Sequence, residues 1–216
     1  MKKFRFGING FTLKWIAIIT MIIDHVGAVL YPQYIILRII GRISFPIFCF
    51  LLVEGVMHTR NIRKYERRLL LFALLSEIPF DLTFYGGITL EHQNVFFTLL
   101  IGVLMLEIME RQRDSMYSFL AIFGAIFLTE MLATDYKAGG ICIILCFYYL
   151  YQKSFAKQLA FIGMNYLYYG TGVQSYAALA AIPMLLYNGE RGPKMKYFFY
   201  LFYPLHLLIL YLIIKL

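Results

Sequence analysis

The stretch LKWIAIITMIIDHVGAVL, Leu13–Leu30, is an apolar run that contains one aspartate and one histidine. A run of about 18 largely apolar residues can cross the ~30 Å hydrocarbon core of a bilayer as an α-helix. Asp24 and His25 lie inside this run, where an ionisable side chain is costly unless it faces a cavity or a partner. The stretch therefore predicts a transmembrane helix whose two titratable residues serve structure or function.

The composition of the whole chain also indicates a membrane protein. Of its 216 residues 61% are hydrophobic, whereas a soluble domain is about half apolar. Apolar segments recur along the full length, so we expect one integral membrane domain, residues 1–216. The basic start MKKFRFGINGF precedes a run of spanning length that carries Asp24 and His25, so a cleaved signal peptide is not expected.

The three cysteines and the net charge exclude other classes. Cys49, Cys142 and Cys146 all lie in apolar runs and are expected to be buried, reduced thiols. The net charge of +8 does not indicate nucleic-acid binding, because the charges are sorted by loop.

Nine apolar segments predict nine membrane-spanning helices, and hence an all-α, polytopic transmembrane helix bundle. The segments cover roughly residues 13–30, 35–57, 67–85, 95–110, 116–134, 138–152, 157–169, 174–187 and 196–214. The three between residues 138 and 187 are short for an upright helix, so we expect them to tilt, thin the bilayer or break.

Lysine and arginine alternate between the predicted loops. One set of alternate loops holds most of the 20 cations, beginning with Lys2, Lys3 and Arg5. The other set, with the C-terminus, holds Lys137 and Lys215. The positive-inside rule therefore predicts a cytoplasmic N-terminus and an external C-terminus.

Two predicted spans carry charged residues in pairs. Arg38 and Arg42 are four residues apart in the second span, and Glu77 and Asp81 are four apart in the third. Residues at this spacing share a helix face, and Arg42 and Asp81 lie at similar predicted depths. We therefore expect an ion-pair ladder between the two helices. This ladder either only holds the bundle together or lines a polar cavity.

His25 needs a partner from another helix, because its neighbours three and four positions away are apolar. Asp24 points about 100° away from it, which suggests a structural partner such as Arg38. The last span adds His206 at mid-depth. No ligand spacing supports a metal site from the two histidines and a carboxylate, so no metal is expected.

The predicted cytoplasmic side is basic. HTRNIRKYERR, His58–Arg68, holds five cations and Tyr65, which fits ordinary topology with anionic-lipid contact or an anion site. The turn YNGERGPK, with Asn188 and Arg191, lies on the same side. A polyanionic donor would dock on these residues, and an acceptor would arrive from outside.

Several blocks of the chain together resemble the TraX family, in the family's order from about residue 13 to the C-terminus. They are LKWIAIITMIIDHVGAVL, LRIIGRISFPIFCFLLVEGVMHTRNIRKYERRLLLFALLSEIPFDL, NVFFTLLIG, LYNGERG and YFFYLFYPLHLLIL. The founding members N-acetylate the amino terminus of the conjugative pilin subunit in the inner membrane. The layout is more distantly similar to the acyltransferase-3 membrane acetyltransferases. Lys14 with His25, and Arg60 with Arg63, match two short motifs of that group.

The resemblance implies an acetyltransferase in the bacterial inner membrane, with acetyl-CoA bound from the cytoplasm. The acceptor would be a peptide amino terminus such as that of pilin, or a surface glycan. The implied donor-binding residues are Lys14, Arg60, Arg63, Tyr65, Arg68, Asn188, Arg191 and His206. The implied catalytic residues are His25, Asp24, Arg42, Glu77 and Asp81.

The roles within that catalytic set remain alternatives. His25 would act as general base, oriented by Glu77 or Asp81, or would carry the acetyl group itself. Arg42 would stabilise the oxyanion. Two other classes of protein remain: a small transporter or flippase with a buried charged cavity, and an integral scaffold of a secretion or conjugation complex.

Overall fold

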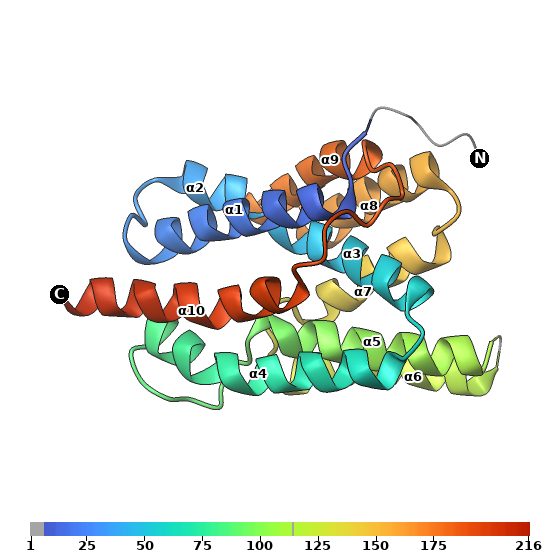
Figure 1. The fold of residues 1–216 in the computed structure, drawn as a ribbon, viewed down its shortest axis with the longest axis horizontal. Helices are drawn as coiled ribbons and strands as arrows, with labels where there is room; N and C mark the ends of the chain where they lie inside the picture. The colour runs from blue at the N-terminus through green and yellow to red at the C-terminus, as the bar shows by residue number, and fades with distance from the viewer. Residues whose placement is uncertain (1–6, 114) are drawn as a thin grey trace. The chain divides into compact units, whose positions relative to one another are not determined.

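The computed structural model describes residues 7–113 and 115–216, and this part of the chain is helical without a β-strand (Figure 1). The elements are α1 (Gly10–Val29), α2 (Ile35–Gly41), α3 (Ser44–His58), α4 (Ile62–Phe84), α5 (Val95–Arg111), α6 (Met116–Met131), α7 (Lys137–Tyr149), α8 (Ser154–Tyr169), η1 (Val173–Ala180), α9 (Ala181–Leu185) and α10 (Lys196–Lys215). The predicted all-α fold is confirmed. Lys2, Lys3 and Arg5, which contribute to the predicted orientation, lie outside the described residues.

The helices match the predicted segments within a few residues, with two differences. The second segment is two helices, α2 and α3, separated at Arg42 and Ile43. The eighth is the 3-10 helix η1 followed by the short helix α9. Three helical stretches are long and apolar enough to cross a membrane: Gly10–Val29, Ile35–His58 and Tyr197–Lys215. The count of nine crossings and the cytoplasmic N-terminus stay predictions.

The chain divides into two compact units, each assembled from segments far apart in the sequence. Unit 1 comprises the described residues up to Leu51 together with Leu145–Phe199, and unit 2 comprises Leu52–Ile144 and Tyr200–Leu216. The Asp24, Arg38 and Arg42 side chains thus belong to unit 1, and Glu77 and Asp81 belong to unit 2.

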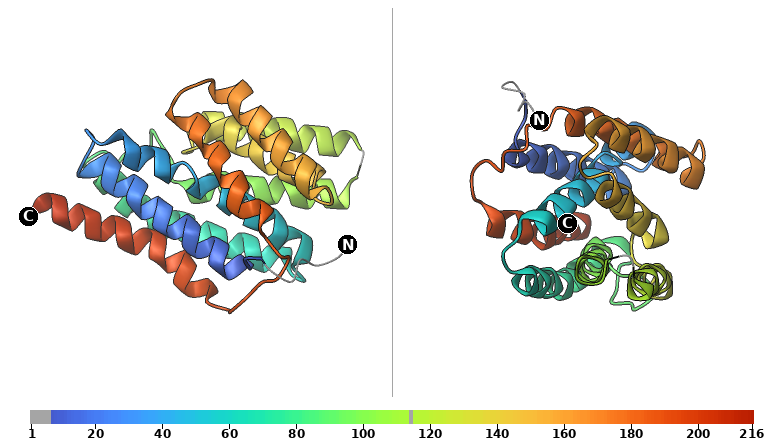
Figure 2. Two further views of the ribbon diagram at one scale, coloured as in Figure 1. Left: turned by 90° about the horizontal axis from the view of Figure 1, so that it is seen from above. Right: turned by 90° about the vertical axis from the view of Figure 1, so that its right-hand side faces the viewer.

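In unit 1, α1 packs against α2, and α8 packs against η1 and α9 (Figures 1 and 2). Aromatic side chains form part of its core. Phe50 meets Phe147 edge-on at 5.8 Å between ring centroids, and Phe147 meets Phe161 at 5.2 Å. Phe147 and Phe161 are fully buried, so these contacts join α3, α7 and α8.

In unit 2, α4, α5 and α6 lie side by side, as the end-on view in Figure 2 shows. Helix α10 packs on α4 and α5 through Tyr200, whose ring stacks on Phe72 at 5.1 Å and on Phe96 at 6.0 Å. Farther along, the Thr83 hydroxyl donates a hydrogen bond to the Leu207 carbonyl at 2.9 Å. These contacts place the first half and the middle of α10 against α4.

Candidate functional site

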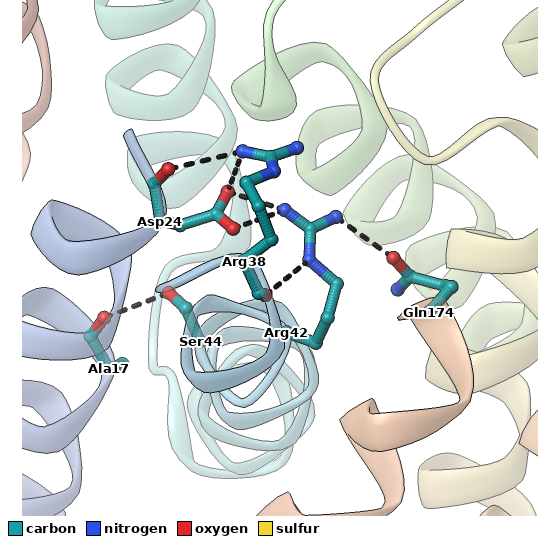
Figure 3. A network of polar contacts seen from close by, with 6 residues as sticks. All are labelled: Ala17, Asp24, Arg38, Arg42, Ser44 and Gln174. Carbon is teal, nitrogen blue, oxygen red and sulfur yellow. Dashed lines mark hydrogen bonds and ion pairs between the residues drawn. The ribbon is translucent and has the colours of Figure 1, made fainter. Parts of the chain in front are cut away.

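The Asp24 carboxylate on α1 forms ion pairs with two arginines in unit 1 (Figure 3). Arg38 Nη1 donates to Asp24 Oδ2 at 2.9 Å and to the Asp24 carbonyl at 3.2 Å. Arg42 Nη2 donates to both carboxylate oxygens. Asp24 is only 7% exposed, so the predicted structural pairing of Asp24 with Arg38 is confirmed and Arg42 joins it.

Small residues allow α1 and α2 to approach closely enough for this pairing. A Cβ atom on Gly27 would lie 2.5 Å from the Leu37 Cβ atom, which no real side chain tolerates. Gly41 lies directly against Asp24. At the start of α3 the Ser44 hydroxyl donates to the Ala17 carbonyl at 2.8 Å (Figure 3), which holds α3 to α1.

Arg42 follows the last residue of α2 and connects distant parts of unit 1. Its Nε donates to the Arg38 carbonyl at 3.2 Å, and its Nη1 donates to Gln174 Oε1 at 2.9 Å (Figure 3). Within unit 1 Arg42 thus binds Asp24 and Gln174, and the predicted ladder that includes Arg42 and Asp81 stays a prediction. Gln174 was missed, although an amide at the start of a predicted span was a usable signal.

His25 and Lys14 mark two levels of α1. His25 is half-buried beside Asp24. Lys14 lies 11 residues earlier, about 16 Å along the helix axis at 1.5 Å per residue. The Lys14 ammonium lies 5.4 Å from the centroid of the Phe199 ring, and Arg191 is close enough to act on it electrostatically. Lys14 therefore places a positive charge in the first half of α1, and Asp24 and His25 place an acid and a base in its second half.

A backbone clasp brings Asn188 and Arg191 to the start of α1. The Ile8 amide donates to the Leu186 carbonyl at 2.9 Å, and the Asn188 amide donates to the Ile8 carbonyl at 3.0 Å. The Gly10 amide donates to the Glu190 carbonyl at 2.7 Å. Three residues of the predicted donor-binding set, Lys14, Asn188 and Arg191, thus lie in unit 1.

The rest of the predicted donor-binding set lies in unit 2. Arg60 precedes α4, Arg63, Tyr65 and Arg68 lie in its first two turns, and His206 lies in α10. The Arg68 guanidinium lies 5.6 Å from the centroid of the Tyr65 ring and hydrogen-bonds the Tyr200 hydroxyl. Its Nε is buried and has no hydrogen-bond partner among the described residues. Arg60 and Arg63 are exposed. Tyr200 was missed, because nothing in the sequence relates it to Arg68.

A second missed feature is a pair of carboxyl groups at the same end of unit 2. Glu66 hydrogen-bonds Glu107 of α5. Burial, this hydrogen bond and the charge of Glu107 raise the pKa of Glu66 to about 7, against the opposing charges of Arg111 and Arg63. Glu107 also forms an ion pair with Arg111 at 2.6 Å. Glu66 can therefore gain or lose a proton near neutral pH.

Glu77 and Asp81 each use one carboxylate oxygen for structure and leave the other without a partner. The Asn94 amide group donates to Glu77 Oε2, and the Thr89 backbone N–H donates to Asp81 Oδ2 at 3.0 Å. Glu77 Oε1 and Asp81 Oδ1 have no hydrogen-bond partner among the described residues, and Asp81 is fully buried. Both groups can thus accept a further hydrogen bond.

His206 is buried in α10. Its Nδ1 lies 2.9 Å from the Phe202 carbonyl, which can only accept, so Nδ1 carries a proton. The ring stacks on Phe202 at 5.3 Å and meets Tyr203 edge-on at 5.5 Å. Within residues 7–113 and 115–216, no group of three His, Cys, Asp or Glu side chains is arranged to hold a metal ion.

The apolar helices and the buried charged network define an all-helical membrane protein. The chain belongs to the TraX family, whose model, described as TraX protein, matches residues 9–214. The chain is 32% identical to the probable fimbrial assembly protein FimC, serogroup H1, of Dichelobacter nodosus, over 94% of each chain. It is 33% identical to the uncharacterized protein RP591 of Rickettsia prowazekii (strain Madrid E), over 42% of this chain and 33% of that one. No solved structure matches the chain.

Proposed function

We propose that this protein is a multi-pass acetyltransferase of the bacterial inner membrane that acts in a pilus-related process. It takes the acetyl group from cytoplasmic acetyl-CoA and transfers it to an acceptor at the outer side, either a peptide amino terminus such as that of pilin or a surface glycan. Membership of the TraX family and the relative named as a fimbrial assembly protein support the process. The apolar helices support the location.

The observation that carries the proposal is the arrangement of α1 within unit 1. Lys14 lies near Arg191, where a phosphate group would be attracted to two cations. About 16 Å farther along the helix, His25 lies beside the buried Asp24. This separation suits a donor whose anionic nucleotide and reactive thioester are joined by a long arm.

The proposed acetyl transfer uses the residues around His25, in the second half of α1. The acceptor amine or hydroxyl attacks the thioester carbonyl, its proton passes to the His25 imidazole, and the C–S bond breaks to release CoA thiolate. Both oxygens of Asp24 accept bonds from guanidinium groups, so Asp24 is already engaged by Arg38 and Arg42. Its role is to hold Arg42, whose charge can stabilise the oxyanion.

The experiment that tests the proposal follows acetyl-CoA turnover by the purified protein in nanodiscs, as thiol release with and without a peptide acceptor. We expect His25→Ala to abolish acceptor-dependent release while CoA still binds. His92→Ala is the control, because this histidine lies outside the segments that the proposal assigns to donor binding and catalysis.

The alternative classes give different results. A wild-type protein that neither binds nor consumes acetyl-CoA would overturn the acetyltransferase proposal and favour a transporter or flippase. Full complementation of pilus assembly by His25→Ala, without acetyl transfer by the wild type, would favour a scaffold.

A further inference from the structure

A stripe of buried amide side chains runs along α8 in unit 1. Gln158 is 1% exposed and Asn165 is fully buried, and residues seven apart lie on one helix face. Neither Gln158 Nε2 nor Gln158 Oε1 has a hydrogen-bond partner among the described residues. Asn165 Nδ2 donates to the Ser175 carbonyl at 2.9 Å, but its Oδ1 has none. Buried amides without partners are costly.

The stripe continues through η1 to the network around Asp24. Gln174 precedes Ser175, and its Oε1 accepts from Arg42 (Figure 3). Its Nε2 is buried and has no hydrogen-bond partner in the described chain. Unit 1 therefore holds three amide side chains with unsatisfied donors or acceptors, and the last of them touches the guanidinium that binds Asp24.

The other end of the stripe leads to the clasp that carries Asn188 and Arg191. Lys157, next to Gln158, is 4% exposed, and its ammonium lies 4.7 Å from the centroid of the Phe50 ring. Phe50 in turn meets Tyr187 edge-on at 5.3 Å. Contacts within unit 1 thus join the clasp, through Phe50 and Lys157, to Gln158.

The unsatisfied atoms define the chemistry of a matching ligand. They include two donor groups, Gln158 Nε2 and Gln174 Nε2, and two acceptors, Gln158 Oε1 and Asn165 Oδ1. A phosphate or carboxylate offers acceptors alone, and an acyl chain offers neither. A chain with secondary amides supplies both a carbonyl acceptor and an N–H donor at each amide.

We propose that Gln158, Asn165 and Gln174 line the path of the pantetheine arm of acetyl-CoA and hydrogen-bond its two amides and its hydroxyl group. The inference rests on the proposed function, since it names the residues that hold the donor between its nucleotide and its thioester. Gln158 and Asn165 are about 10 Å apart along α8. This is less than the length of the extended arm but more than the separation of its two amides, so one of the two residues meets the hydroxyl group of the arm.

The test compares two ligands on wild type and Gln158→Leu in nanodiscs, by isothermal titration calorimetry. The ligands are CoA and its nucleotide part, 3′-phospho-ADP, which lacks the arm. We expect Gln158→Leu to raise the Kd for CoA at least about fivefold, because up to two hydrogen bonds are lost, and to leave the Kd for 3′-phospho-ADP unchanged. Methionine is closer in shape to glutamine than leucine is, and we expect Gln158→Met to raise the Kd for CoA as Gln158→Leu does. Gln152→Leu is the control, because Gln152 is exposed.

The outcomes separate this inference from the proposed function. If wild type binds CoA, and both folded Gln158 variants bind it equally well, the inference is overturned while acetyl transfer stands. Equal affinity of wild type for CoA and 3′-phospho-ADP would also overturn it, since the arm would then contribute nothing. If wild type binds neither ligand, the proposed function itself fails and takes this inference with it.

Discussion

A Cβ atom on Gly41 of α2 would lie 2.1 Å from Oδ1 of Asp24 on α1. Residue 41 must therefore lack a side chain for α2 to deliver Arg38 and Arg42 to the Asp24 carboxylate. The ion-pair network depends on this close approach of the two helices as much as on the charged residues themselves.

Gly41→Ala is accordingly expected to separate α1 from α2 and to destabilise the protein by about 1–3 kcal/mol, the usual cost of overpacking. The measurement is thermal unfolding in detergent, together with thiol release. Gly124→Ala is the matched control, because a Cβ atom there would meet nothing within 4 Å. Equal melting temperatures for the two variants would contradict the steric role of Gly41.

Asp24→Asn is expected to destabilise the fold by about 3 kcal/mol, because it leaves the buried guanidinium of Arg42 without its counter-charge. Glu110→Gln removes the acid of an ion pair whose side chains are 31% and 65% exposed, and should change stability by less than about 1 kcal/mol. Denaturant titration of both variants checks the contrast. Similar losses would mean that the Asp24 network is solvated like the surface pair.

Gly192→Ala is expected to weaken donor binding by disturbing the clasp. Gly192 has a φ of +69°, and a Cβ atom there would lie 2.8 Å from the Phe11 Cβ atom and 2.9 Å from Asn9. Gly189 has a φ of +80° but open space around it, so Gly189→Ala carries the backbone strain alone. We expect Gly192→Ala to raise the Kd for CoA more than Gly189→Ala, as calorimetry would show.

The Glu66–Glu107 pair predicts a pH dependence of stability. The pKa of Glu66 is raised from 4.5 to about 7, so the folded protein binds this proton more tightly than the unfolded chain. The protonated Glu66 carboxyl therefore stabilises the folded protein fully below pH 4.5, and this stabilisation is lost as the pH rises to 7 and beyond. We expect Glu66→Gln to flatten the fall in melting temperature between pH 5 and 7.5. An unchanged slope would exclude Glu66 as its source.

The helices themselves could be read from the sequence, because spanning length and apolar composition identify such segments without knowledge of their neighbours. The break between α2 and α3 was also signalled, because Pro46 in the first turn of α3 has no N–H to donate to the Arg42 carbonyl, but the prediction of one span over residues 35–57 passed over it. The 3-10 conformation of η1, by contrast, was hidden in an Ala-rich segment that reads as an α-helix.

The contacts between site residues were harder to predict than the identity of those residues. The Asp24–Arg38 pair follows from two adjacent helices, and sequence reasoning found it. The Arg42–Gln174 contact joins residues 132 apart, for which no periodicity exists. Gln158 and Asn165 were visible as amides in a short apolar span, but only the packing of α8 on η1 shows that they are buried.

The wide separation of Arg42 and Gln174 has a consequence for biosynthesis. At about 5–20 residues per second, a ribosome takes roughly 7–26 s to make the chain between them. During that interval the hairpin of α1 and α2 exists without Gln174, and Asp24, already made, is the counter-ion of Arg38 and Arg42. The carboxylate can thus neutralise both arginines of this hairpin before the rest of unit 1 has been synthesised.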